Sequence, residues 1–140
     1  MKFLKDTYKR TVDYMRVSVT DRCNLRCIYC MPARGFVPVE HEEILRYEEI
    51  ARILEIAAGI GVRKIRITGG EPLVRRNILR LVNLVKKIEG IEDLSLTTNG
   101  ILLAEYADPL VEAGLDRVNI SLDSLKTERY REITRGGAAW

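Results

Sequence analysis

The side chains best suited to chemistry are three thiols that lie within eight residues of one another. Their spacing is Cys23-x3-Cys27-x2-Cys30, and the sequence contains no other cysteine. An odd number of cysteines rules out a complete set of internal disulfides, and thiols this close cannot link distant segments. The pattern therefore predicts a metal or cluster site rather than a disulfide scaffold.

Two kinds of site fit three clustered thiols. Three thiolates can each bind one iron of a four-iron, four-sulfur ([4Fe-4S]) cluster and leave the fourth iron open for chemistry. The alternative is a structural zinc ion with His41 as its fourth ligand. Structural zinc sites normally join two separated ligand pairs, whereas His41 lies beyond Pro32 and Pro38 in an irregular stretch. We therefore favour the cluster.

Size and composition indicate one soluble globular domain. The chain has 140 residues, of which 46% are hydrophobic and 31% charged. No apolar run is long enough to cross a bilayer, and the N-terminus lacks the apolar stretch of a secretory signal, so we expect a cytoplasmic protein without a membrane partner. The net charge of +3 gives no case for a nucleic-acid partner.

The elements that must position the thiols alternate along the chain. Period-two patterns predict strands over residues 15–20, 64–68, 94–98 and 117–122. Helical patterns predict helices over residues 47–58, 78–88, 103–113 and 127–133. Asn77 is a candidate N-cap of the second helix, and Gly114 a candidate stop of the third. Strand–helix alternation with short connections predicts an α/β fold with a parallel sheet and right-handed crossovers.

The unusual segments all follow strands. The cysteine loop follows the first strand, and Gly69-Gly70-Glu71-Pro72 follows the second. Thr97-Thr98-Asn99-Gly100 closes the third strand, and Ser121-Leu122-Asp123-Ser124 closes the fourth. Ligands of parallel sheets gather at the carboxyl ends of the strands, so we expect these four segments to surround one site.

Two arginines lie inside predicted strands. If Arg16 and Arg66 point into a barrel interior, each needs an anionic partner, because an unpaired buried charge is costly, and a triphosphate fits that need. If Arg66 instead faces the helices, it would pair with a carboxylate, and the sequence alone does not decide between these. The sequence also leaves the roles of Thr97 and Ser121 undecided: each side chain either contacts a ligand or caps the end of its strand with its hydroxyl.

The cysteine pattern, with the aromatic Tyr29 directly before Cys30, resembles the signature of the radical S-adenosylmethionine superfamily. The segment from Gly69 to Pro72 resembles that superfamily's GGEP motif, whose backbone binds the methionyl amino group. The resemblance implies a [4Fe-4S] cluster held by Cys23, Cys27 and Cys30. It also implies S-adenosyl-L-methionine as a cofactor that is cleaved to a 5′-deoxyadenosyl radical.

A narrower resemblance covers nearly the whole chain. The segments 16–24, 66–73, 96–100 and 119–123 resemble the GTP 3′,8-cyclase family of molybdenum-cofactor biosynthesis. The family implies a lyase that abstracts hydrogen from the ribose of GTP and joins C3′ to C8 of guanine. It also implies a reductant protein for the cluster. By the resemblance, Tyr29, Gly70 and Ser121 contact S-adenosylmethionine, and Arg16, Arg66 and Thr97 contact GTP.

The resemblance also implies that residues 1–140 form the N-terminal part of a radical SAM domain. About four of roughly six βα units of a partial TIM-type barrel are expected, because members of the family are roughly twice as long as this chain. No cysteine that could bind the family's second cluster follows Cys30. We accordingly expect that this chain alone does not complete GTP cyclisation. Four strands cannot close a barrel, so we expect an exposed strand edge that favours self-association, of which a homodimer is one form, or low stability.

Overall fold

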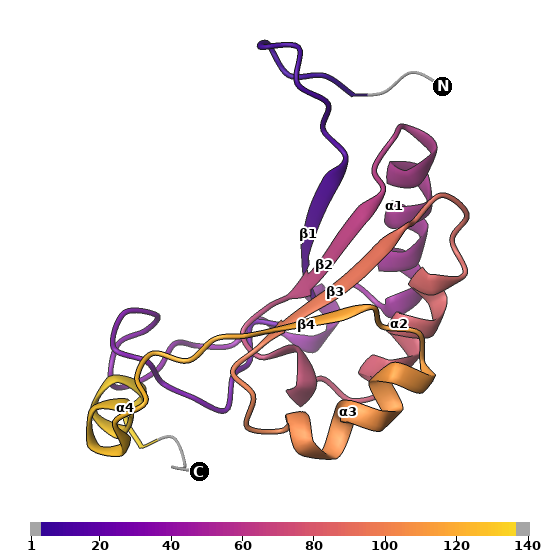
Figure 1. Cartoon of the computed structure of the whole chain (residues 1–140). Coiled ribbons are helices and arrows are strands. Elements are labelled where there is room, and N and C mark those ends of the chain that lie inside the picture. The colour runs from indigo at the N-terminus through magenta and orange to yellow at the C-terminus, as the bar shows by residue number, and fades with distance from the viewer. Residues whose placement is uncertain (1–3, 137–140) are drawn as a thin grey trace.

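The computed structural model describes residues 4–136 and contains one four-stranded parallel sheet in the order β1-β2-β3-β4. The strands are β1 (Tyr14–Ser18), β2 (Lys64–Thr68), β3 (Asp93–Thr98) and β4 (Arg117–Ile120). Each strand pairs in parallel with the next one along the chain. All four therefore point their carboxyl ends toward the same edge of the sheet (Figure 1). This confirms the predicted α/β class and the partial, open barrel.

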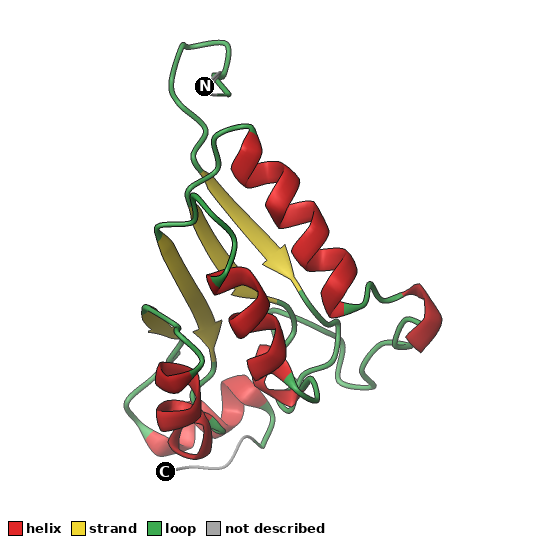
Figure 2. Ribbon diagram, turned by 90° about the vertical axis from the view of Figure 1, so that its right-hand side faces the viewer, coloured by secondary structure: helices red, strands yellow, loops and turns green. Residues whose placement is uncertain are grey.

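Helices fill the connections between the strands. They are α1 (Tyr47–Gly59), α2 (Ile78–Lys86), α3 (Leu103–Glu112) and α4 (Thr127–Thr134), with short 3-10 turns η1 (His41–Glu43) and η2 (Pro72–Val74). Seen from the side in Figure 2, helices lie in front of the strands and cover one face of the sheet. No helix within residues 4–136 combines the length and the apolar character that a membrane span requires.

The hydrophobic core lies between the sheet and the first helices. Alternate residues of β2 and β3 are fully buried, among them Ile65, Ile67, Leu94 and Leu96. They pack in one cluster with the apolar stripes of α1 and α2, of which Leu54 is a completely buried member. Burying a side chain of this size contributes about 1.5–3 kcal/mol, so this face holds the fold together.

The other face of the sheet carries the intervening residues of each strand. Arg16, Arg66 and Thr97 alternate with residues of the core cluster, so their side chains lie on the face that α1 and α2 do not cover. In the described part of the chain this is the open, inner side of the partial barrel. Arg66 thus faces inward, which decides the orientation that the sequence left open.

Element boundaries agree with the prediction to within about two residues, and Asn77 occupies the predicted N-cap position of α2 but does not cap the helix with its side chain. Asn77 precedes α2 in a left-handed conformation (φ 58°), and its side chain makes no capping hydrogen bond. Its carbonyl oxygen instead accepts a hydrogen bond from the backbone N–H of Arg80 at 2.9 Å. Gly114 does end α3: it has φ 95°, and Leu115 N–H donates to the carbonyl of Leu110.

The last helix does not pack on the sheet. α4 lies apart from α1–α3 and beside the loop that follows β1 (Figure 1). The backbone N–H of Ile28 donates to the carbonyl of Ile133 at 2.9 Å, and that of Arg26 donates to the carbonyl of Thr134 at 3.3 Å. α4 therefore supports the cysteine loop rather than covering β4.

Candidate active site

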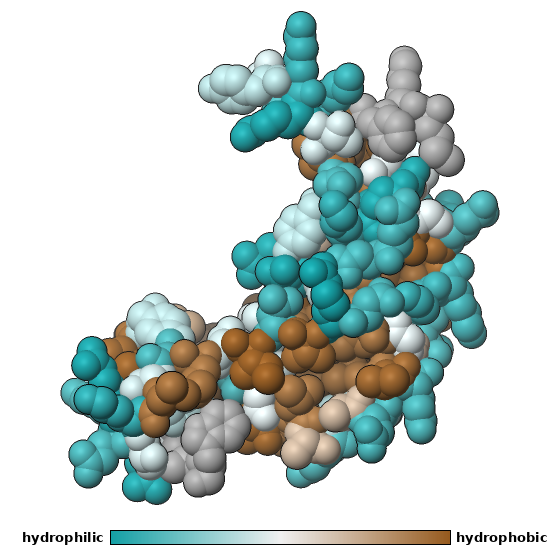
Figure 3. Space-filling model, viewed as in Figure 1, coloured by the Kyte–Doolittle hydropathy of each residue, from teal (hydrophilic) through white to brown (hydrophobic). Residues whose placement is uncertain are grey.

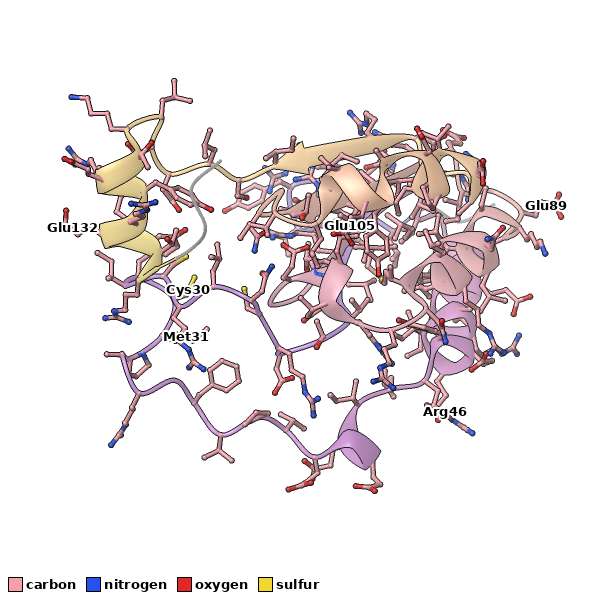
Figure 4. The ribbon with its side chains drawn as sticks, turned by 90° about the horizontal axis from the view of Figure 1, so that it is seen from below. Cys30, Met31, Arg46, Glu89, Glu105 and Glu132 are labelled. Carbon is pink, nitrogen blue, oxygen red and sulfur yellow. The ribbon has the colours of Figure 1, made fainter. Side chains whose placement is uncertain are left out.

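The three cysteines lie on the first part of the long loop between β1 and α1. All are free thiols; Cys27 is buried, Cys23 is half-buried and Cys30 is exposed. A turn joins the last two, because the N–H of Cys30 donates to the carbonyl of Cys27 at 2.9 Å. Figure 4 shows Cys30 and Met31 beside α4, with Arg46 at the far end of the same loop.

Segments from other strands hold this loop on both sides. On the sheet side, Gly70 N–H donates to the carbonyl of Thr20 at 2.6 Å, and Glu71 N–H donates to that of Arg22 at 2.8 Å. On the α4 side, the guanidinium of Arg135 donates to the carbonyl of Met31 at 2.7 Å. A loop fixed in this way keeps its thiols in place before any metal binds.

Tyr29 ties the cysteine loop to the end of β4. Its hydroxyl donates to the Asp123 carboxylate, at 2.9 Å and 3.1 Å from the two oxygens. Partial desolvation, together with this carboxylate, raises the pKa of Tyr29, so the hydroxyl remains a donor at neutral pH. Tyr29 and Ser121, both predicted cofactor contacts, are thereby brought to the same end of the sheet.

Burial raises the pKa of the Cys23 and Cys27 thiols. At Cys23 the negative charge of Glu71 acts in the same direction, while the N–H of Leu25, 3.4 Å from the sulfur, acts against it. Without metal these thiols therefore hold their protons at neutral pH. Binding a metal centre must release those protons, because thiolates are the ligands.

Within the described residues, no group of three or more His, Cys, Asp or Glu side chains converges where one metal ion could bind. A cubane does not need that convergence, because each thiolate binds a different iron. The three free thiols on one fixed loop therefore fit a cluster. The side chain of His41 lies outside the described part of the structure, which leaves it untested as a zinc ligand.

Gly70 packs directly against the residues before Cys23. A β-carbon built on Gly70 would lie 2.2 Å from the carbonyl oxygen of Arg22 and 2.8 Å from that of Asp21. No other residue fits there without displacing backbone. The predicted cofactor contact is thus also the point where the GGEP segment touches the cysteine loop.

Glu71 is the most buried charged residue of the described chain, at 1% exposure. Its carboxylate accepts hydrogen bonds from Leu73 N–H at 3.1 Å, the Thr98 hydroxyl at 2.7 Å and Asn99 N–H at 2.7 Å. These bonds join the loop after β2 to the end of β3. Glu71, Asn99 and Asp123 were not among the predicted site residues, although each lies in a strand-end segment that the sequence singles out.

On the open face, Arg16 and Arg66 are in-register neighbours on β1 and β2. Neither forms an ion pair within residues 4–136, and the Nε of Arg66 is buried without a hydrogen-bond partner. The Arg66 guanidinium lies 5.5 Å from the centre of the Tyr14 ring. Thr97 lies two strands away from Arg16 on the same face, opposite Asn119 of β4. The three predicted substrate contacts thus share one surface.

Ser121 follows β4 directly. Its backbone N–H donates to the carbonyl of Thr98 at 2.8 Å, and its side chain is exposed. Ser121 extends the pairing of β3 and β4 by one residue, and its hydroxyl remains available to a ligand.

Comparison with known proteins places these features in context. The family model described as the radical SAM superfamily matches residues 17–140. The chain is 57% identical over 134 residues to the GTP 3′,8-cyclase of Alkaliphilus oremlandii, covering 96% of this chain and 42% of that protein. It is 60% identical over 132 residues to the GTP 3′,8-cyclase of Heliobacterium modesticaldum, covering 94% and 40% respectively. The chain therefore spans about two fifths of the length of these relatives.

Solved structures share the fold at low sequence identity. The peptide-bound structure of Streptococcus suis SuiB superposes with a TM-score of 0.68 at 23% identity, covering 86% of this chain and 26% of that one. BtrN in complex with AdoMet and 2-DOIA superposes with a TM-score of 0.62 at 19% identity, covering 99% and 54%. At these identities the similarity supports the fold alone.

Proposed function

Because the chain belongs to the radical SAM superfamily, we propose that it carries the cluster, cofactor and triphosphate sites of a GTP 3′,8-cyclase. Such an enzyme is a lyase that converts GTP to (8S)-3′,8-cyclo-7,8-dihydroguanosine 5′-triphosphate in molybdenum-cofactor biosynthesis. The proposal for the substrate rests on the high identity to cyclases over this part of their length. We place the reaction in the cytoplasm, where exposed thiols stay reduced.

The superfamily uses a [4Fe-4S] cluster and S-adenosylmethionine, and the thiols of Cys23, Cys27 and Cys30 would hold the cluster. A bound, reduced cluster would supply the electron that cleaves S-adenosylmethionine to methionine and a 5′-deoxyadenosyl radical. The chain's own part is to fix the cysteine loop. The close contact at Gly70 and the Tyr29–Asp123 bond support this, because both join the loop to neighbouring strand ends.

The observation that carries the phosphate site is the unpaired arginine side chain on the open face. The Nε of Arg66 is buried without a partner, and Arg16 lies beside Arg66 in register. Arg66 is half-buried and Arg16 is exposed beside it, so an anion bound between the two guanidinium groups would relieve their repulsion and give the Arg66 Nε a partner. Guanidinium groups also bind phosphate oxygens in pairs. A nucleoside triphosphate bound to this face supplies that anion.

A reductant protein must reach the cluster from outside. Cys30 is exposed, and the arginines around the loop, among them Arg22, Arg26 and Arg34, are exposed as well. We therefore propose that the donor presents an acidic surface to this loop, so that its affinity falls as the salt concentration rises.

The substrate proposal is tested by GTP binding to the metal-free chain, measured by calorimetry. Arg66→Ala and Arg16→Ala should each weaken binding at least about tenfold, because each removes a charged hydrogen-bond donor worth about 1.5–3 kcal/mol. Arg52→Ala is the matched control, since Arg52 pairs with Glu55 on the outer surface of α1. Guanosine should bind more weakly than GTP. Unchanged GTP affinity in both inner-face variants would remove the proposed phosphate site.

A further inference from the structure

The Cys23 sulfur has more polar neighbours than the cysteine pattern alone explains. The backbone N–H of Leu25 donates to it at 3.4 Å, and the side-chain amide nitrogen of Asn99 lies 4.0 Å from it. Asn99 comes from the end of β3, 76 residues further along the chain. The sulfur of one proposed cluster ligand thus has a donor from a distant segment beside it.

The amide of Asn99 has only one orientation that satisfies its neighbours. Its Oδ1 accepts a hydrogen bond from Ile101 N–H at 3.1 Å, so the nitrogen must point the other way. The amide nitrogen carries two hydrogens. One is donated to Oδ1 of Asn24 at 2.7 Å, and the other is directed at the Cys23 sulfur. Reversing the amide would place an oxygen against the oxygen of Asn24 and against the sulfur.

Glu71 fixes the backbone of Asn99. Its Oε2 accepts the Asn99 N–H at 2.7 Å, while Oε1 is held by the Thr98 hydroxyl and by Leu73 N–H. At 1% exposure and with three accepted hydrogen bonds, this carboxylate is held in one position. Glu71 therefore links the GGEP segment to the donor at Cys23.

We propose that Asn99 is a positioning residue of the cluster site, whose side-chain amide, anchored through Glu71 and Asn24, donates a hydrogen bond to the Cys23 sulfur. An N–H donor on a cluster thiolate draws negative charge away from the sulfur and so favours the reduced cluster. This inference rests on the proposed cluster site and deepens it. Asn99 sets how readily the cluster accepts an electron.

The test is the midpoint potential of the cluster in the anaerobically reconstituted chain without S-adenosylmethionine, followed by absorbance and EPR. Asn99→Ala removes the donor. Asn99→Asp keeps the side-chain shape and the oxygen that accepts the Ile101 N–H, but it replaces the amide donor beside the Cys23 sulfur with an acceptor. Asn83→Ala is the matched control, because the Asn83 amide donates to the carbonyl of Leu79 on the exposed side of α2, far along the chain from the cysteine loop.

Both Asn99 variants should take up a parental amount of iron and show a more negative midpoint potential. For Asn99→Ala the ratio of reduced to oxidised cluster at the parental midpoint should fall about fivefold, which corresponds to one hydrogen bond. For Asn99→Asp it should fall further, and Asn83→Ala should match the parent.

Parental potentials in both loaded Asn99 variants would overturn the inference and leave the cluster site intact. Loss of iron from both variants, with iron retained by the control, would also overturn it, because Asn99 would then be needed to form the site rather than to tune it. A parent chain that takes up no four-iron cluster would remove the proposed function itself, and this inference with it.

Discussion

Replacing Gly70 by alanine should weaken the packing contact between the cysteine loop and the GGEP segment. The added β-carbon would lie 2.2 Å from the oxygen and 2.7 Å from the carbon of the Arg22 carbonyl. Both atoms belong to the backbone, so no side-chain rotation can relieve the overlap. The segment must retreat by about 1 Å to reach an ordinary van der Waals separation.

This displacement should lower the free energy of unfolding. Overpacking a tight site costs about 1–3 kcal/mol. The displacement also lengthens the Gly70–Thr20 and Glu71–Arg22 backbone hydrogen bonds, which are 2.6 Å and 2.8 Å long. At about 1 kcal/mol for each weakened bond, the total loss in the free energy of unfolding should be about 3–5 kcal/mol.

Urea unfolding followed by circular dichroism measures this loss, and Gly59→Ala provides the control. Gly59 ends α1, and beyond the helix's own backbone no described atom lies within 4 Å of the position its β-carbon would take. Alanine there should leave stability unchanged or raise it by up to about 1 kcal/mol. Gly70→Ala should also lose affinity for S-adenosylmethionine. If its unfolding free energy stays within about 0.5 kcal/mol of the parent, the steric reasoning is wrong.

Three further changes probe other parts of the structure. Glu71→Gln should lower the free energy of unfolding, measured by urea titration, by about 1–3 kcal/mol, because the new amide nitrogen would place a second donor against the Asn99 N–H. A variant as stable as the parent would contradict this. The Lys86 ion pair and the Leu94 N–H hold the pKa of Asp116 below its usual value despite the opposing effect of burial. The stability difference between the parent and Asp116→Asn should therefore be constant above about pH 5 and shrink as the pH falls below about 4, whereas a difference independent of pH would refute it. Ile120→Lys should reduce self-association, measured by light scattering, because β4 is an edge strand and Ile120 is 55% exposed on it. Apolar side chains gather over β4 and α3 (Figure 3), and a parent chain that is already monomeric would contradict this prediction.

The sequence was enough to predict the fold because its signals are local and periodic. Alternation in β2 and the helical stripe of α2 each fixed an element and its buried face. The side-chain cap expected at Asn77 does not form, because asparagine favours both an N-cap and a left-handed turn, and Asn77 adopts the turn. α4 was predicted as a helix, but its place beside the cysteine loop depends on contacts with Arg26 and Ile28 that no local pattern encodes.

The sequence predicted which segments form the candidate site, but not the role of every residue in them. Strand-end motifs indicated one common edge, and the structure gathers them there. Individual roles were harder to predict, because Glu71 and Asn99 act through bonds between loops that are 28 residues apart in sequence. The inward direction of Arg66 could be given only as one of two choices, since a single charged residue in an apolar strand fits either face until the partners of Ile65 and Ile67 are known.

The central claim is that the cysteine loop holds a cluster that cleaves S-adenosylmethionine. The most direct measurement is the formation of 5′-deoxyadenosine by the anaerobically reconstituted chain, with S-adenosylmethionine and dithionite. We expect a brown protein with about four irons per chain that releases 5′-deoxyadenosine, and loss of both properties in Cys27→Ser. A colourless protein that binds a single zinc ion and releases no 5′-deoxyadenosine would contradict the account.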